Sequence, residues 1–180
     1  MVKKLYIPSE DSYLLAKSVK EYSGKRALEI GVGSGIVFEE LQKNFELVVG
    51  TDLLIQSLRY ARHNIRSRNN LTICCNMSAP IRCKFDLIVS NPPYLPNLTD
   101  ELYSDLPVDG GTTGIEWSIK FLEFSVPRLE PTGKILLLLS SISNIEKLEF
   151  FVKRMRFVKK KVNQQKLFYE TIKVFEISRI

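Results

Sequence analysis

The stretch RALEIGVGSG, residues 26–35, places a short apolar strand directly before three closely spaced glycines, Gly31, Gly33 and Gly35. Glycine adopts backbone conformations that other residues avoid, and it lets a ligand come close to the main chain. A strand that ends in such a turn and continues into a helix over 36–43 is typical of a doubly wound α/β fold, where ligands bind beyond the carboxyl ends of the strands. The spacing is G-x-G-x-G rather than G-x-G-x-x-G, so the glycines alone do not identify the ligand.

Strand and helix patterns alternate along the rest of the chain. Apolar spacing and start signals indicate helices over 9–19, 36–43, 55–68, 113–129 and 142–154. Pro127 either fixes the last turn of the helix over 113–129 or ends that helix early. Apolar runs indicate strands over 26–30, 46–51, 71–75, 85–90, 134–139, 157–162 and 167–177, the last two joined by a turn at 163–166. This order predicts right-handed crossovers and a doubly wound, mostly parallel seven-stranded α/β sheet that ends in an antiparallel C-terminal hairpin.

Size and composition limit the class of protein. The chain has 180 residues, of which 44% are hydrophobic and 26% charged, so we expect a single globular domain over residues 1–180. No apolar run approaches the roughly 20 residues that span a bilayer, and the first residues lack the apolar segment of a signal peptide. We therefore expect a cytoplasmic protein with no membrane partner. The net charge of +6 suits an acidic partner such as nucleic acid, although it also serves solubility alone.

The cysteine and histidine pattern predicts no metal site. Cys74, Cys75 and Cys83 are an odd number without a C-x-x-C spacing, and His63 is the only histidine. The adjacent pair lies in the apolar stretch 71–75, so we expect buried structural cysteines there rather than a reactive thiol. His63 lies in a basic run that indicates a solvated helix face, and we assign it no catalytic role.

Two acidic residues at strand ends indicate the chemistry of the ligand. Asp52 ends the second strand, about twenty residues beyond the glycines, where a carboxylate can accept both hydroxyls of a ribose. Glu29, beside the glycine loop, disfavours a pyrophosphate and favours a cationic ligand. Together they favour S-adenosylmethionine over NAD. The alternative is a glycine turn and a strand-end acid that serve folding alone.

The stretch VSNPPYLPN, residues 89–97, ends a buried strand in an unusual way. Pro92 and Pro93 have no backbone N–H and cannot extend a sheet, so the strand should end before Asn91. The Asn91 side chain and the Asn91 and Pro92 carbonyls are then available as hydrogen-bond acceptors, and the aromatic ring of Tyr94 offers a planar surface beside them. This pattern predicts a site for a planar group that donates hydrogen bonds. A proline-terminated strand with a half-buried tyrosine is the alternative.

These motifs together resemble a known family. The glycine loop, Asp52 and NPPY resemble class I methyltransferases that methylate planar nitrogens. More closely, YIPSEDSYLLAKSV (6–19), FDLIVSNPPYLP (85–96) and DGGTTGIEW (109–117) resemble the HemK-type protein-glutamine methyltransferases, which modify class I release factors. The resemblance runs from residue 6 to about 141 and is closest to the short archaeal and eukaryotic branch. It implies a Rossmann-like class I methyltransferase fold and S-adenosylmethionine as cofactor.

The resemblance also implies which residues form the site. The expected cofactor-binding residues are Ser12, Glu29, Gly31, Gly33, Gly35, Asp52, Asn76 and Asn91. The expected catalytic residues, which match the family's substrate-amide motif, are Asn91, Pro92, Pro93 and Tyr94. At position 76 relatives usually carry an aspartate that faces adenine, so Asn76 implies a weaker contact.

The expected partners are a class I release factor as substrate and, by resemblance alone, a small zinc-binding activator at the sheet edge near the third strand. The main alternative is a nucleic-acid methyltransferase that holds the exocyclic amino group of a flipped base in the same site. A non-catalytic binding module and an NAD-dependent oxidoreductase are more distant alternatives. The acidic, glycine-rich segment 95–113 is expected to be either a lid over the substrate or a solvated loop.

Overall fold

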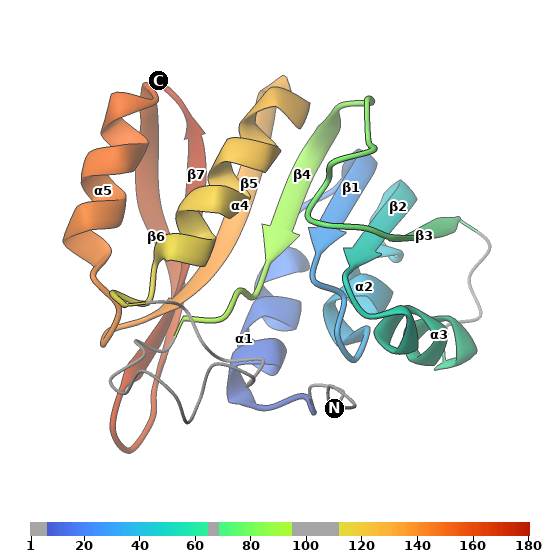
Figure 1. The fold of residues 1–180 in the computed structure, drawn as a ribbon, viewed down its shortest axis with the longest axis horizontal. Helices are drawn as coiled ribbons and strands as arrows, with labels where there is room; N and C mark the ends of the chain where they lie inside the picture. The colour runs from blue at the N-terminus through green and yellow to red at the C-terminus, as the bar shows by residue number, and fades with distance from the viewer. Residues whose placement is uncertain (1–6, 65–68, 95–111) are drawn as a thin grey trace.

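The computed structural model describes residues 7–64, 69–94 and 112–180 (Figure 1). The helices are α1 Glu10–Val19, α2 Ile36–Leu41, α3 Ile55–Asn64, α4 Glu116–Ser125 and α5 Ile145–Arg154, with a short 3-10 helix at Val126–Arg128. The strands are β1 Gly24–Ile30, β2 Phe45–Asp52, β3 Asn70–Cys74, β4 Phe85–Ser90, β5 Leu129–Ser140, β6 Phe157–Lys166 and β7 Thr171–Arg179.

The strands form one seven-stranded sheet in the order β3-β2-β1-β4-β5-β7-β6. All neighbouring pairs from β3 to β5 are parallel, whereas β7 is antiparallel to both β5 and β6. This topology confirms the predicted fold class, including the antiparallel C-terminal pair. Because the parallel strands all point the same way, the ends of β1, β2 and β4 meet at one edge of the sheet, where the β4 arrow ends in Figure 1.

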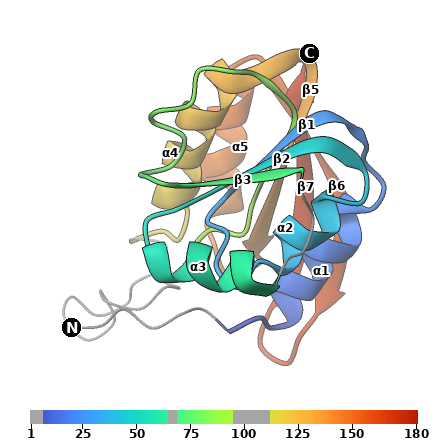
Figure 2. The same cartoon turned by 90° about the vertical axis from the view of Figure 1, so that its right-hand side faces the viewer.

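The hydrophobic core forms two layers, one on each face of the sheet. One layer combines residues of α1, α2 and α3 with one face of the strands, and the other combines α4 and α5 with the opposite face. Figure 2 shows α1 and α2 on one side of the sheet and α4 and α5 on the other. β4 is buried almost throughout, as its apolar run predicts, because both layers cover it.

Several predicted boundaries differ from the structure. The helix predicted over 113–129 is α4 followed by a 3-10 turn that contains Pro127, and Leu129 already belongs to β5. α5 begins three residues later than predicted, at Ile145, because the Asn144 side chain accepts a hydrogen bond from the Lys147 N–H and caps the helix. The end of the helix predicted over 55–68 lies outside the described residues.

The predicted hairpin turn at 163–166 is wrong. These residues continue β6, with an irregular register between Lys161 and Asn163, and the turn lies at 167–170. β6 is an edge strand, and its residues Gln164, Gln165 and Lys166 are exposed to solvent, so this part of the strand resembles a turn in the sequence.

The predicted burial of the adjacent cysteines is also wrong. β3 forms the other edge of the sheet, which leaves Cys74 exposed and Cys75 half-buried. In the part of the chain that the structure describes, no helix is long and apolar enough to cross a membrane.

Candidate active site

Asn91 follows β4 and is held by a buried carboxylate. Its Nδ2 donates a hydrogen bond of 3.0 Å to Oδ2 of Asp11, which lies in the first turn of α1 and is only 2% exposed. A carboxylate only accepts hydrogen bonds, so the amide nitrogen of Asn91 must face Asp11 and the amide oxygen must face away. That oxygen, Oδ1, is buried and has no hydrogen-bond partner among the described residues. The site therefore contains a free, oriented acceptor.

Tyr94 is fixed at both ends. Its hydroxyl lies 3.3 Å from the same Asp11 oxygen, and its backbone carbonyl accepts a bond of 2.8 Å from the Ser143 hydroxyl, just before α5. The ring packs against both hydrophobic layers. Asp11 thus connects the two polar side chains of the N-P-P-Y motif, Asn91 and Tyr94, to the start of α1.

Asp11 is the functional candidate that sequence reasoning missed. Its other oxygen, Oδ1, accepts hydrogen bonds from the Ser9 hydroxyl (3.0 Å), the Ser12 N–H (2.6 Å) and the Ser12 hydroxyl (3.2 Å). Ser12, which the family resemblance implies as a site residue, is buried beside it. In the sequence Asp11 resembles an ordinary acidic residue in a first helical turn, where acids favour the helix dipole. Only the packing of α1 against the end of β4 reveals its burial.

Glu29, near the end of β1, is the second buried carboxylate of this edge. It is 3% exposed, and its Oε2 has no hydrogen-bond partner in the described ranges. Burial raises the pKa of this carboxyl well above its usual range, and the negative charge of Asp52 raises it further. A positively charged ligand group would oppose this shift and lower the pKa of Glu29, because it would stabilise the ionised carboxylate.

The glycine loop adopts the conformation that its sequence requires. Gly31, Gly33 and Gly35 have φ angles of 84°, 52° and 85°, in the left-handed region that favours glycine. A Cβ added to Gly31 would meet nothing within 4 Å, so the main chain there borders open space.

Asp52 joins the glycine loop to the end of β2. Its carboxylate accepts hydrogen bonds from the N–H groups of Gly33 (2.9 Å) and Leu54 (2.8 Å). Each carboxylate oxygen has a further lone pair, so Asp52 can also accept bonds from ligand hydroxyls. The N–H of Cys75 donates to the Asp52 carbonyl at 3.0 Å, and exposed Asn76 follows directly.

The sheet order aligns these groups in a row. Asn76 follows β3, Asp52 ends β2, Glu29 and Gly31 lie at the end of β1, and Asn91 follows β4, and these four strands are adjacent in the sheet. An extended ligand that lies across the strand ends can contact all of them in turn. The arrangement suits a base and ribose near β3 and β2, a cationic group near β1 and a second reactant near β4.

A family model for the methyltransferase small domain matches residues 9–169, which is most of the chain. The chain belongs to this family. A protein of Methanocaldococcus jannaschii that carries a provisional name as a protein N5-glutamine methyltransferase is 33% identical over 151 residues, covering 80% of this chain and 76% of that protein. The release factor glutamine methyltransferase of Bradyrhizobium diazoefficiens is 31% identical over 136 residues, covering 68% of this chain and 46% of that protein. These relatives confirm the resemblance found in the sequence.

Solved structures agree on the fold of this methyltransferase. The E. cuniculi Mtq2–Trm112 complex, described as responsible for methylation of the eRF1 translation termination factor, contains a chain with a TM-score of 0.72 and 24% identity. The match covers 97% of this chain and 98% of that chain. At this identity the likeness shows the fold alone.

S-adenosylmethionine is the cofactor of the family, and the residues present fit it. The unpartnered Oε2 of Glu29 suits a cationic ligand, and the open space beside Gly31 leaves room for a ligand close to the main chain. Asp52 retains acceptor capacity for ribose hydroxyls. We therefore expect Glu29, Gly31 and Asp52 to hold the cofactor, which supplies an electrophilic methyl group when bound.

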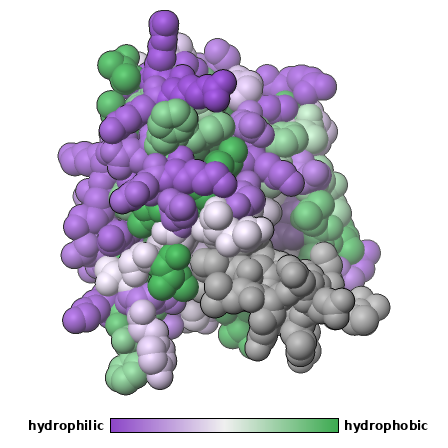
Figure 3. All heavy atoms as spheres, turned by 60° about the vertical axis from the view of Figure 1, so that its left-hand side comes forward, coloured by the Kyte–Doolittle hydropathy of each residue, from purple (hydrophilic) through white to green (hydrophobic). Residues whose placement is uncertain are grey.

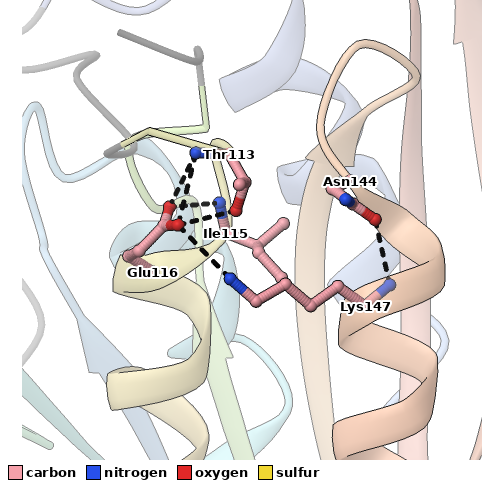
Figure 4. Close-up of polar contacts among 5 residues, drawn as sticks. All are labelled: Thr113, Ile115, Glu116, Asn144 and Lys147. Carbon is pink, nitrogen blue, oxygen red and sulfur yellow. Dashed lines mark hydrogen bonds and ion pairs between the residues drawn. The ribbon is translucent and has the colours of Figure 1, made fainter.

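The segment that returns from the site to α4 is fixed by a polar network (Figure 4). The Glu116 carboxylate accepts hydrogen bonds from the Thr113 hydroxyl (2.6 Å) and from the N–H groups of Thr113 and Ile115 (3.2 Å each), and it forms an ion pair with Lys147 at 3.6 Å. The Asn144 N–H donates to the Thr113 carbonyl at 3.1 Å. Most of the predicted lid, residues 95–111, lies outside the described residues.

Proposed function

We propose that this methyltransferase transfers the methyl group of S-adenosylmethionine to the side-chain amide of a glutamine, in the Gly-Gly-Gln motif of a class I release factor. The observation that carries the proposal is the buried Oδ1 of Asn91, an oriented acceptor without a partner among the described residues. A primary amide has two N–H groups, and such an acceptor matches one of them. The name of the M. jannaschii relative supports a protein glutamine as the methyl acceptor, and the name of the B. diazoefficiens relative supports a release factor as the protein that carries it.

The chain's residues would act by positioning. One substrate N–H donates to Asn91 Oδ1 and the other to the Pro92 carbonyl, so the nitrogen presents its lone-pair face to the methyl group. Tyr94 stacks on the amide plane. The negative charge of Asp11 beside Asn91 Nδ2 polarises the Asn91 amide and makes Oδ1 a stronger acceptor. Positive charge that develops on the substrate nitrogen is stabilised by these two oxygens.

A general base is not needed before methyl transfer. The sulfonium methyl is already a strong electrophile, and the methylated nitrogen becomes acidic enough to release its proton to water afterwards. The absence of a histidine or cysteine from the N-P-P-Y motif is consistent with this order of events.

We also propose an activator subunit at the edge of β3. The E. cuniculi structure contains Trm112 as a second chain. In this chain β3 is an edge strand, and it exposes Leu71 and Cys74. An exposed edge strand can pair with a strand of another protein.

The test is methyl transfer from radiolabelled S-adenosylmethionine to a class I release factor, with and without a candidate activator. Label on the release factor that disappears when the glutamine of its Gly-Gly-Gln motif is replaced by asparagine supports the proposal. Ribosomal RNA is offered separately, because the net charge of +6 favours a nucleic-acid substrate as the second candidate. Label on RNA alone would overturn the protein substrate.

A further inference from the structure

Two aromatic side chains project into solvent at the turn between β6 and β7. Phe168 and Tyr169 are each 90% exposed, and their ring centroids lie 4.6 Å apart with the planes at 82°. The neighbouring Leu167 is half-buried against the α1 layer, and its N–H donates to the Glu170 carbonyl at 2.8 Å, which closes the turn. The turn is therefore fixed at its base while both rings stay in water. Adjacent exposed aromatic rings are typical of a binding surface.

This turn lies at the same edge of the sheet as Asn91. Ser140, at the end of β5, pairs with Ile172, and Thr171 exchanges two hydrogen bonds of 2.9 Å with Ser141. Two residues further on, the Ser143 hydroxyl holds the Tyr94 carbonyl. In Figure 1 the hairpin extends beyond the edge at which β4 ends. A macromolecule bound near Asn91 would thus have the hairpin turn beside it.

The hairpin is strongly basic. Between residues 157 and 173 the sequence has five lysines and one glutamate. The register places Lys161, Lys173 and Lys166 on one face, opposite Phe175, Gln164 and Thr171 respectively. In the described part of the chain none of these three forms an ion pair, whereas Lys159 pairs with Glu149 at 3.3 Å. Figure 3, which views the side of α5 and β6, shows a mainly hydrophilic surface whose protruding lower end carries hydrophobic and near-neutral side chains.

We propose that the β6–β7 hairpin turn is a second contact for the substrate protein, and that it binds an acidic surface with an apolar centre next to the methylated side chain. Phe168 and Tyr169 would insert into the apolar centre, and Lys161, Lys166 and Lys173 would face the acidic groups. This inference rests on the proposed function, because the substrate there is a protein. The two rings are perpendicular, so they do not form the parallel platforms on which successive bases stack.

The experiment compares two double variants with matched controls on an intact class I release factor. Phe168→Ser with Tyr169→Ser removes the aromatic pair, and Lys161→Glu with Lys166→Glu reverses the charge. The control for the first is Ile180→Ser, which changes a similarly exposed apolar residue at the C-terminus, at the opposite end of the molecule in Figure 1. The control for the second is Lys25→Glu with Lys84→Glu, two exposed lysines beside the amino ends of β1 and β4.

We expect each hairpin double variant to raise KM and the directly measured dissociation constant for the release factor roughly tenfold, as loss of a binding hot spot does. kcat, the affinity for S-adenosylmethionine and the thermal unfolding midpoint should stay unchanged, and both controls should match the wild type. The effect of charge reversal should weaken at high salt.

Three outcomes would overturn the proposal. Unchanged binding of the release factor would show that the hairpin is not a contact, and a parallel loss of cofactor affinity would show a structural role. Weakened binding of RNA with unchanged binding of the release factor would assign the surface to nucleic acid. The directly measured dissociation constant for the release factor does not depend on methylation, so it tests the hairpin contact separately from the proposed function. A release factor that binds wild type through the hairpin but is never methylated contradicts the function and not the contact.

Discussion

The two halves of the candidate site each contain a buried carboxylate, and the two carboxylates differ in their hydrogen-bond partners. Asp11, in the substrate half, accepts hydrogen bonds from Ser9, Ser12 and Asn91. Glu29, in the cofactor half, has an oxygen with no partner among the described residues. Both are almost fully buried, so burial alone does not explain the difference. We infer that Asp11, whose oxygens accept hydrogen bonds from the protein, orients the side chains that donate to it. Glu29, which has an oxygen without a hydrogen-bond partner among the described residues, is available to bind a ligand.

The largest effect is expected where the oriented acceptor itself is removed. Asn91→Ala should lower kcat by roughly 10²- to 10³-fold, the loss found when one group that stabilises a developing charge is removed. The affinity for S-adenosylmethionine should largely survive, because Glu29 and Asp52 remain. Steady-state methylation and calorimetric titration of the cofactor measure the two effects. Turnover above about a tenth of the wild-type value would rule out this role for Asn91.

A smaller loss of activity is expected for Asp11→Asn, which removes the charge of this side chain but keeps its shape. In Asp11→Asn the new amide can donate as well as accept, so it no longer determines which way the Asn91 amide points. We expect kcat to fall about 10- to 100-fold while KM for the cofactor changes little. The same substitution should cost about 1–3 kcal/mol of unfolding free energy, because buried donors lose an ionised acceptor.

A double-mutant cycle separates orientation from stability. If Asp11 acts through Asn91, then Asp11→Asn should add little to the loss of activity in Asn91→Ala, although both proteins unfold more easily. Additive losses of kcat in the double variant would show that Asp11 does not act through Asn91.

Glu29→Gln should separate function from stability in the other half of the site. The folded-state pKa of Glu29 is raised, so its contribution to stability is complete below the unfolded pKa and is lost as the pH rises through the folded pKa. At neutral pH a neutral glutamine avoids this loss. The ligand-free variant should therefore melt higher, by about 2–4 °C for each kcal/mol gained, while it binds S-adenosylmethionine roughly tenfold more weakly.

Thermal unfolding between pH 4 and 8, with and without saturating S-adenosylmethionine, tests this sign. The gain in the melting temperature of Glu29→Gln should shrink as the pH falls toward 4, and saturating cofactor should reverse the order of the two proteins. A variant that is less stable than the wild type at pH 7 without cofactor would show that the protein itself stabilises the Glu29 carboxylate.

Patterns within single elements predicted the sheet well, because they depend on local sequence. The apolar runs of β4, Phe85–Ser90, and of β5 both predicted central strands of the sheet. The glycine spacing predicted a loop at the end of β1, and Asp52 was predicted beside it. The strand order then brought Asn91 next to this loop, as the doubly wound topology requires.

Features that depend on position in the sheet were not predictable in this way. The Asn-Gln-Gln-Lys run at 163–166 is polar because β6 is an edge strand, and the sequence alone does not distinguish an exposed edge from a turn. Cys74 is exposed for the same reason at the opposite edge. Asp11 became a buried partner of Asn91 only because α1 packs beside the end of β4, across 80 residues of sequence.

The smallest effect is expected at Glu116, a third carboxylate that is satisfied but partly exposed. Partial burial acts to raise its pKa, but the hydrogen bonds from Thr113 and Ile115 outweigh burial and lower the pKa overall. Its stabilising contribution is therefore present above the unfolded pKa and is lost as the pH falls through the folded pKa. Because the side chain is 37% exposed, solvent screens the ion pair with Lys147, and Glu116→Gln should cost at most about 1 kcal/mol at pH 7.

Glu123→Gln, an exposed position on the same helix, is the matched control and should leave stability unchanged. Urea unfolding of both variants at pH 7 and below pH 4 measures the difference, which should disappear at the lower pH. A loss in Glu116→Gln that persists unchanged at low pH would show that the network depends on the shape of the side chain and not on its charge. The comparison of carboxylates would then concern Asp11 and Glu29 alone, because both are almost fully buried and their effects depend on whether each carboxyl is ionised.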